Sequence, residues 1–100
     1  MRVPGQTRQT IARRCLVSGR VQGVNYRATA AQRARLHGIG GYARNLEDGR
    51  VEVLACGEAP AVEAFIEWLW LGPAAAKVTD VLIEVLVLEP PQHPRGFAIA

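Results

Sequence analysis

The stretch "IARRCLVSGRVQGVNYRATAAQRARLHG", residues 11–38, changes its hydrophobic period halfway along and thereby decides the fold. Over residues 11–18 the apolar side chains recur with a period of two, which predicts a strand. A glycine-containing loop follows over residues 19–25. Residues 26–37 are rich in alanine and predict a helix, which Gly38 ends. The folded part of the chain is therefore predicted to begin with a strand, a loop and a helix.

The rest of the chain adds a hairpin, a second helix and a long strand. Asp48-Gly49 before an alternating run indicates a hairpin turn, and Pro60 suits the first turn of a helix. The further predicted elements are a strand (40–46), a turn (47–49), a strand (50–56), a helix (60–71), a strand (77–88) and a short edge strand within 95–100. The order predicts an α+β, ferredoxin-like βαββαβ sandwich. We expect an antiparallel sheet with two helices on one face and a short fifth edge strand.

Length and composition agree with one domain that lacks a membrane span. The chain has 100 residues, of which 49% are hydrophobic, and no apolar run reaches the ~18 residues of a membrane helix. Residues 1–10 are predicted to form a flexible basic tail and residues 11–100 the folded domain. The basic N-terminus has no apolar stretch of a signal peptide, so we expect a cytoplasmic protein. The net charge of +3 suits a small anion as well as a nucleic acid.

The two cysteines, Cys15 and Cys56, do not form a C-x-x-C pair. Cys15 shares a face with Val17, which is assigned to the core, whereas Cys56 is out of phase with Val51 and Val53. The cysteines are therefore expected to point to opposite faces and to form no disulfide. The sequence also shows no His, Cys, Asp and Glu cluster with metal-ligand spacing, so no metal or other cofactor is expected.

The loop "GRVQGVNYR", residues 19–27, has the parts of an anion site. Gly19 and Gly23 let the backbone approach a ligand, and the loop enters a helix N-terminus whose free N–H groups favour an anion. Arg27 adds a planar fork of donors, and its place at a helix N-terminus is easier to explain if an anion binds there. The alternative interpretation is a tight structural turn.

Asn45 is expected at the same edge of the sheet as this loop. A right-handed crossover makes the first two strands parallel with another strand between them, so the end of "GGYARNL" lies beside the loop. An amide there can donate to one partner and accept from another, and so hold a water molecule beside a phosphate. The alternative is that Asn45 only shapes the following turn.

At these residues the chain resembles the acylphosphatase family, enzymes that hydrolyse carboxyl phosphates. "GRVQGVNYR" resembles the first signature of the family, "GYARNLEDGRVEVLACG" (41–57) the second, and "GPAAAKVTDV" (72–81) the pattern after the second helix. The resemblance runs from about Cys15 to Ile99 and makes residues 11–100 an acylphosphatase-like domain.

The resemblance implies that Arg27 binds the phosphate, that Asn45 orients the attacking water and that no metal is used. It also implies that backbone amides of the loop cradle the phosphoryl oxygens; the loop residues are Gly19, Arg20, Val21, Gln22, Gly23, Val24, Asn25 and Tyr26. Tyr26 stands where phenylalanine is more usual, which adds a hydroxyl that needs a partner. The chain ends at Ala100 without the polar or aromatic ending of many members, although a carboxylate there could still hold Arg27.

The chemistry explains why neither an acid nor a metal is required. The leaving group is a carboxylate, whose acid has a pKa of about 4, so it departs without protonation. The transition state is expected to be loose, so positioning and electrostatics carry most of the work. The substrate is an acyl phosphate, with inorganic phosphate as product and inhibitor. Nothing in the motifs selects among acetyl, carbamoyl and glyceroyl phosphate.

Two other functions fit the same fold. RNA binding would need aromatic side chains on the open face of the sheet, but the positions assigned to it are Leu16, Ser18, Glu52 and Leu54, and Glu52 would repel phosphate. A catalytically silent binding or regulatory module is the second alternative. We expect a monomer with no nucleic-acid or membrane partner.

Overall fold

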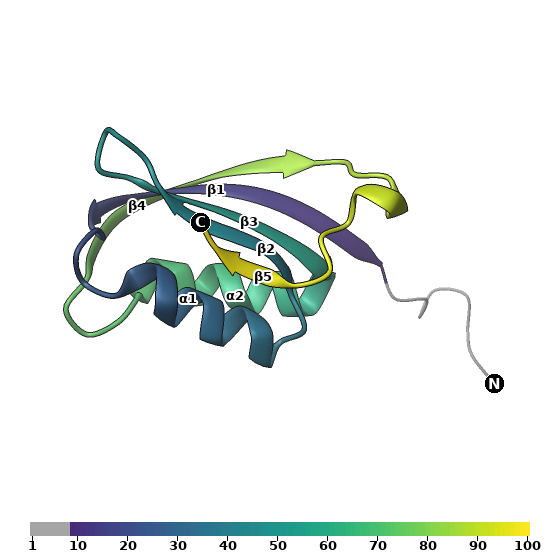
Figure 1. The fold of residues 1–100 in the computed structure, drawn as a ribbon, viewed down its shortest axis with the longest axis horizontal. Coiled ribbons are helices and arrows are strands. Elements are labelled where there is room, and N and C mark those ends of the chain that lie inside the picture. Colours follow the sequence, from purple (N-terminus) through teal and green to yellow (C-terminus); the bar gives the residue numbers. More distant parts are fainter. Residues whose placement is uncertain (1–8) are drawn as a thin grey trace.

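A computed structural model describes residues 9–100 of the chain and shows two helices packed on one face of a five-stranded sheet (Figure 1). The elements in chain order are β1 (Thr10–Arg20), α1 (Tyr26–Leu36), β2 (Gly40–Asn45), β3 (Val51–Glu58), α2 (Ala59–Leu71), β4 (Lys77–Leu86), the 3₁₀ turn η2 (Pro90–Gln92) and β5 (Phe97–Ile99). The predicted α+β, ferredoxin-like fold is confirmed, including the short fifth strand at the edge.

The strand order β4-β1-β3-β2-β5 places β1 and β3 at the centre of the sheet. β3 lies between β1 and β2, as the crossover rule predicts, and the ladders β1–β3, β1–β4 and β2–β3 are antiparallel. The prediction of a wholly antiparallel sheet is wrong at one edge, because β5 pairs with β2 in parallel. A parallel β5 runs toward the same edge as β2, so the chain ends beside Asn45 rather than at the far edge.

The core lies between the sheet and the two helices. Alternate residues of the central strands, such as Val17 and Val53, are fully buried against Phe65 and Leu69 of α2. The small side chains Ala30 and Ala34 let α1 approach the sheet closely. The further buried core positions are Cys15, Val21, Tyr26, Ala31, Ile39, Ala43, Val51, Ala55, Val62, Trp68, Val81 and Phe97.

The first loop is shorter than the sequence predicts. β1 continues to Arg20, so Gly19 lies within the sheet at a register shift against β4. Gly19 has a φ of 120°, and a Cβ there would lie 2.1 Å from the Lys77 carbonyl oxygen. The glycine is required by the close approach of β4. β3 likewise runs past the predicted end of its strand at Cys56, as far as Glu58.

The open face of the sheet differs from its predicted character in two respects. Glu52 was expected to present a free negative charge, but it is only 2% exposed and is ion-paired with both Arg14 and Arg44. The face also carries an aromatic residue, because Tyr42 lies opposite Leu54 in the β2–β3 ladder. The guanidinium of Arg44 lies 5.5 Å from the centre of the Tyr42 ring.

The cysteines occupy opposite faces of the sheet, as predicted. Cys15 belongs to the core and lies opposite Val53, whereas Cys56 lies opposite Ala12 on the other face. Both thiols are free and buried. Burial raises the pKa of the Cys15 thiol to about 11, so it is protonated at neutral pH.

The predicted N-terminal tail falls mostly outside the described residues. Thr10, its last residue, already belongs to β1, and residues 1–8 are not described. Among residues 9–100, no helix is long and apolar enough to cross a membrane.

Candidate active site

The loop between β1 and α1 has a backbone that ordinary residues rarely adopt. Gly23 has a φ of 74°, and Asn25, the N-cap of α1, is left-handed with a φ of 65°. Asparagine tolerates this region better than most side chains, which explains its place. The Asn25 side chain makes no capping hydrogen bond, so N–H groups of the first helical turn are left for another acceptor. Such turns form concave anion-binding surfaces.

Tyr26 anchors the end of this loop in the core. Its ring is 1% exposed and lies 5.7 Å from the Trp68 ring. The hydroxyl predicted to need a partner donates a hydrogen bond of 2.6 Å to the carbonyl oxygen of Leu69. That carbonyl belongs to the last turn of α2, where helical carbonyls lack partners. The loop is thereby tied to the opposite helix, and burial raises the pKa of Tyr26.

Arg27 is half-buried in the first turn of α1, and its guanidinium is held by the end of the chain. Nη1 donates a hydrogen bond of 2.7 Å to a backbone oxygen of Ala100. The N–H of Ala100 in turn donates to the carbonyl oxygen of Ala43 in β2, at 2.9 Å. The sequence left open whether the end of the chain helps to hold Arg27. The structure shows this contact, because the parallel β5 brings Ala100 to the same edge of the sheet.

Asn45 is the last residue of β2 and lies opposite Val51 of β3. Its side chain is exposed, and no hydrogen bond from it to any of residues 9–100 is found. The amide is therefore available to a ligand or to water. The alternative is that Asn45 only shapes the following turn. Within residues 9–100, no hydrogen bond from its side chain to that turn is found.

One cavity of about 230 Å³ brings the predicted residues together. Arg27, Asn45, Gly23 and Asn25 all line it, although they come from different elements of the chain. The remaining lining residues are Val21, Tyr26, Ala28 and Ile99. Four residues of the predicted loop do not line the cavity: Gly19 and Arg20, which belong to β1, and Gln22 and Val24. No pattern in the sequence indicates Ile99 as a site residue, because its place depends on the parallel pairing of β5.

The side chain of Gln22 points to the β2–β3 hairpin. Its Nε2 donates hydrogen bonds to the carbonyl oxygens of Leu46, at 2.8 Å, and of Arg50, at 3.0 Å. The sequence predicted a role for its backbone amide alone. Nothing in the spacing indicates that the side chain reaches another element.

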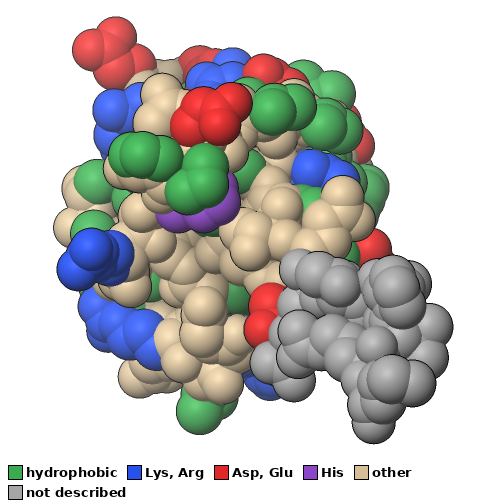
Figure 2. All heavy atoms as spheres, turned by 90° about the vertical axis from the view of Figure 1, so that its right-hand side faces the viewer, with side chains coloured by type: hydrophobic (Ala, Val, Ile, Leu, Met, Phe, Trp, Pro, Cys, Tyr) green, Lys and Arg blue, Asp and Glu red, His purple; other side chains and the backbone are tan. Residues whose placement is uncertain are grey.

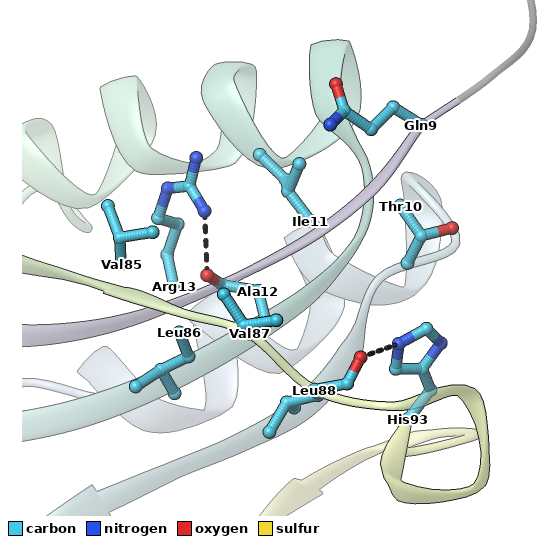
Figure 3. Close-up of a pocket in the computed structure, with 10 residues that line it drawn as sticks. All are labelled: Gln9, Thr10, Ile11, Ala12, Arg13, Val85, Leu86, Val87, Leu88 and His93. Carbon is cyan, nitrogen blue, oxygen red and sulfur yellow. Dashed lines mark hydrogen bonds between the residues drawn. The ribbon is translucent and has the colours of Figure 1, made fainter.

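A second cavity of about 240 Å³ lies at the other end of β1, between the start of β1 and the segment from Val85 to Leu88 (Figure 3). Its two basic groups already have partners, because Arg13 donates to the Ala12 carbonyl oxygen and the His93 ring lies 3.0 Å from the Leu88 carbonyl oxygen. Viewed from this end, the molecule shows hydrophobic side chains interspersed with charged ones (Figure 2). The cavity offers no convergent donors for an anion.

Within residues 9–100, no three His, Cys, Asp or Glu side chains gather closely enough to hold a metal ion. The charged side chain that lines the candidate site is that of Arg27.

The cavity at this edge of the α+β fold, lined by Arg27 and the start of α1, suits the binding of an anion. The family model for acylphosphatases matches residues 13–99. An acylphosphatase of Chromohalobacter salexigens is 54% identical over 81 residues, which cover 78% of this chain and 90% of that protein. The chain belongs to the acylphosphatase family, and its activity is the hydrolysis of acyl phosphates to a carboxylate and inorganic phosphate.

Solved structures agree with this assignment. The crystal structure of acylphosphatase from Bacillus subtilis is 36% identical, with a TM-score of 0.83, and the match covers 90% of this chain and 98% of that one. An acylphosphatase structure from Coxiella burnetii is 33% identical, with a TM-score of 0.84, covering 95% and 99%. The roles of the individual site residues stay predictions.

Proposed function

We propose that this chain hydrolyses acyl phosphates without a metal, by attack of a water molecule that Asn45 orients on a phosphoryl group that Arg27 and the loop amides hold. The observation that carries the proposal is that Arg27, Asn45 and the left-handed residues of the loop line the same cavity. In this proposal the backbone amides of the loop, from about Arg20 to Tyr26, face the phosphoryl oxygens. Gly19 supports the loop from β1.

Arg27 is prepared for a phosphoryl group before substrate arrives. The bond from Nη1 to Ala100 fixes one side of the guanidinium fork. The remaining N–H groups of the fork are then presented in one orientation, which reduces the entropy lost on binding. A fixed donor aimed at the oxygens that gain charge in the transition state lowers the barrier more than a mobile one.

Asn45 acts on the nucleophile in this proposal. Its amide accepts a hydrogen bond from the water and donates another to the phosphoryl group. Strong base catalysis is unnecessary because the transition state is loose, and protonation of the leaving group is unnecessary because a carboxylate departs as an anion. Activity should therefore survive EDTA, whereas a loss that magnesium restores would contradict the metal-independent mechanism.

We further propose a monomeric cytoplasmic enzyme that binds no nucleic acid, with residues 11–100 as the domain and residues 1–10 as a tail. RNA binding would require an aromatic ring that is free to stack on a base. The aromatic residue identified on the open face is Tyr42, and the guanidinium of Arg44 already covers its ring. The pairing of Glu52 with Arg14 and Arg44 also neutralises positive charge on that face.

Replacing Arg27 by alanine tests the proposal, with benzoyl phosphate as substrate. We expect kcat/KM to fall by at least ~10²-fold, the scale for removing one charge-stabilising donor. Inorganic phosphate should also protect the variant less against thermal unfolding than it protects the wild type. Arg27→Lys should remain poor, because a point charge cannot replace the fork.

Arg35→Ala is a matched control on the same helix. Arg35 also donates to β5, through a bond of 2.9 Å from Nη2 to the Phe97 carbonyl oxygen, but it does not line the cavity. We expect this variant to keep kcat/KM within about twofold of the wild type, since a remote surface contact contributes little. Near-normal turnover by Arg27→Ala, or an equal loss in both variants, would overturn the assignment.

A further inference from the structure

The side chain of Gln22 connects the phosphate loop to the strand end that carries Asn45. Its amide nitrogen has two N–H donors, and each reaches a carbonyl oxygen of the hairpin, that of Leu46 at 2.8 Å and that of Arg50 at 3.0 Å. Leu46 directly follows Asn45. The same two residues close the base of the hairpin, because the Leu46 N–H donates to the Arg50 carbonyl oxygen at 2.8 Å.

The hairpin grows out of the β2–β3 ladder, in which Asn45 lies opposite Val51 of β3. Its turn projects from the sheet beyond β2 and β3 (Figure 1). The hydrogen bonds that Asp48 accepts from Arg50 lie within the same turn, so they shape the turn without fixing it to the loop. Gln22 is half-buried and bridges 24 residues of sequence to Leu46. The ladders place β2 beside the end of β1, and the Gln22 side chain adds a direct contact between the loop and the residue that follows Asn45.

We propose that Gln22 is a positioning residue for acyl phosphate hydrolysis: its side-chain amide fixes the hairpin base and so holds Asn45 in line with a phosphoryl group in the loop. This inference rests on the proposed roles of Arg27 and Asn45. Gln22 acts through Asn45 and touches neither the phosphoryl group nor the water with its side chain. A small displacement of the orienting group is costly, since about 1 Å of misplacement can reduce a rate by ~10²-fold.

The principal variant is Gln22→Met, which keeps length and removes both donors. We expect kcat for benzoyl phosphate to fall between about 10- and 100-fold, because the water loses its alignment. The inhibition constant of inorganic phosphate should change by less than about twofold, because Arg27 and the loop backbone are intact. A purely structural role would instead lower the melting temperature and leave kcat per folded molecule unchanged, which would overturn the proposal.

A double-mutant cycle separates this inference from the function on which it rests. In the Asn45→Ala background, Gln22→Met should have almost no further effect on kcat, because the residue it positions is gone. Additive losses would show that Gln22 acts independently of Asn45 and would overturn the inference. If Asn45→Ala lowers kcat while Gln22→Met does not, only the inference fails. If Asn45→Ala itself keeps wild-type kcat, the proposed function fails and the inference fails with it.

Asp48→Ala is the matched control, since it removes contacts within the same hairpin without touching the loop. We expect its kcat to stay within about twofold of the wild type. A loss as large as that of Gln22→Met would mean that general loosening of the hairpin is the cause, which would overturn the proposal. Should Gln22→Met not fold, Gln22→Asn provides the same test, because the shorter amide cannot reach both carbonyl oxygens.

Discussion

Glu52 on the open face of the sheet provides the clearest stability prediction. The carboxylate is 2% exposed, whereas its partners Arg14 and Arg44 are 32% and 52% exposed. Removing one partner of a fully buried pair costs about 3–5 kcal/mol. Both guanidiniums here reach water and can be resolvated, so we expect Glu52→Gln to lower the free energy of unfolding by about 2 kcal/mol. For a domain of this size that corresponds to a melting temperature lower by roughly 10 °C.

The stability effect of Glu52 should depend on pH with a defined sign. Burial alone works to raise the pKa of Glu52, but hydrogen bonds from Arg14 and Arg44 lower it below its ordinary value of 4.5. A carboxyl group whose pKa is lowered by folding stabilises the native state above its unfolded pKa. The stability difference between the wild type and Glu52→Gln should therefore be constant near neutral pH and shrink as the pH falls below about 4.5.

Urea unfolding at pH 7 and at pH 3 measures both effects. Glu84→Gln is the control, because Glu84 also pairs with Arg14, at 2.6 Å, but its side chain is 45% exposed. We expect this exposed pair to contribute less than about 1 kcal/mol. Equal losses in the two variants, or a loss from Glu52→Gln that does not change with pH, would refute the reasoning that burial makes the Glu52 pairs important.

Three further substitutions test how the loop is held. Tyr26→Phe should lower the free energy of unfolding by about 1–2 kcal/mol in urea, because the Leu69 carbonyl loses its donor; unchanged stability would contradict the anchoring role of the hydroxyl. Gly19→Ala should cost more than about 4 kcal/mol, because its Cβ would collide with the Lys77 carbonyl. Gly23→Ala meets nothing within 4 Å and should cost only about 1–2 kcal/mol for its left-handed backbone. Equal costs would contradict the placement of Gly19 in the sheet.

Local patterns in the sequence predicted most of the fold. The change of period around residues 19–25 and the Asp48-Gly49 turn are consequences of chain geometry, and both are found in the structure. The right-handed crossover predicted that Asn45 lies beside the loop that carries Arg27, and both residues line the same cavity. Their roles were predicted from the resemblance of the two signatures to the acylphosphatase family, since the residues alone left a structural turn open at each position.

The features that the sequence did not predict depend on contacts between distant segments. No local pattern shows that Gly19 faces a close approach of β4, or that β5 pairs in parallel with β2. Glu52 reads as a free acid until the strands are paired, since its partners Arg14 and Arg44 lie on separate strands. The side chain of Gln22 is another such case, because its acceptors lie more than 20 residues away.

Replacing Asn45 by aspartate tests the central claim most directly, since it nearly keeps the shape and adds a charge. If Asn45 orients water beside a phosphoryl dianion, the carboxylate is repelled: two like charges about 4 Å apart at an effective dielectric near 20 cost roughly 4 kcal/mol. The measurement is benzoyl phosphate turnover and phosphate inhibition by Asn45→Asp at neutral pH. We predict no measurable turnover and weakened phosphate inhibition. Wild-type activity would contradict the account, because the amide would then not be the group that orients the attacking water.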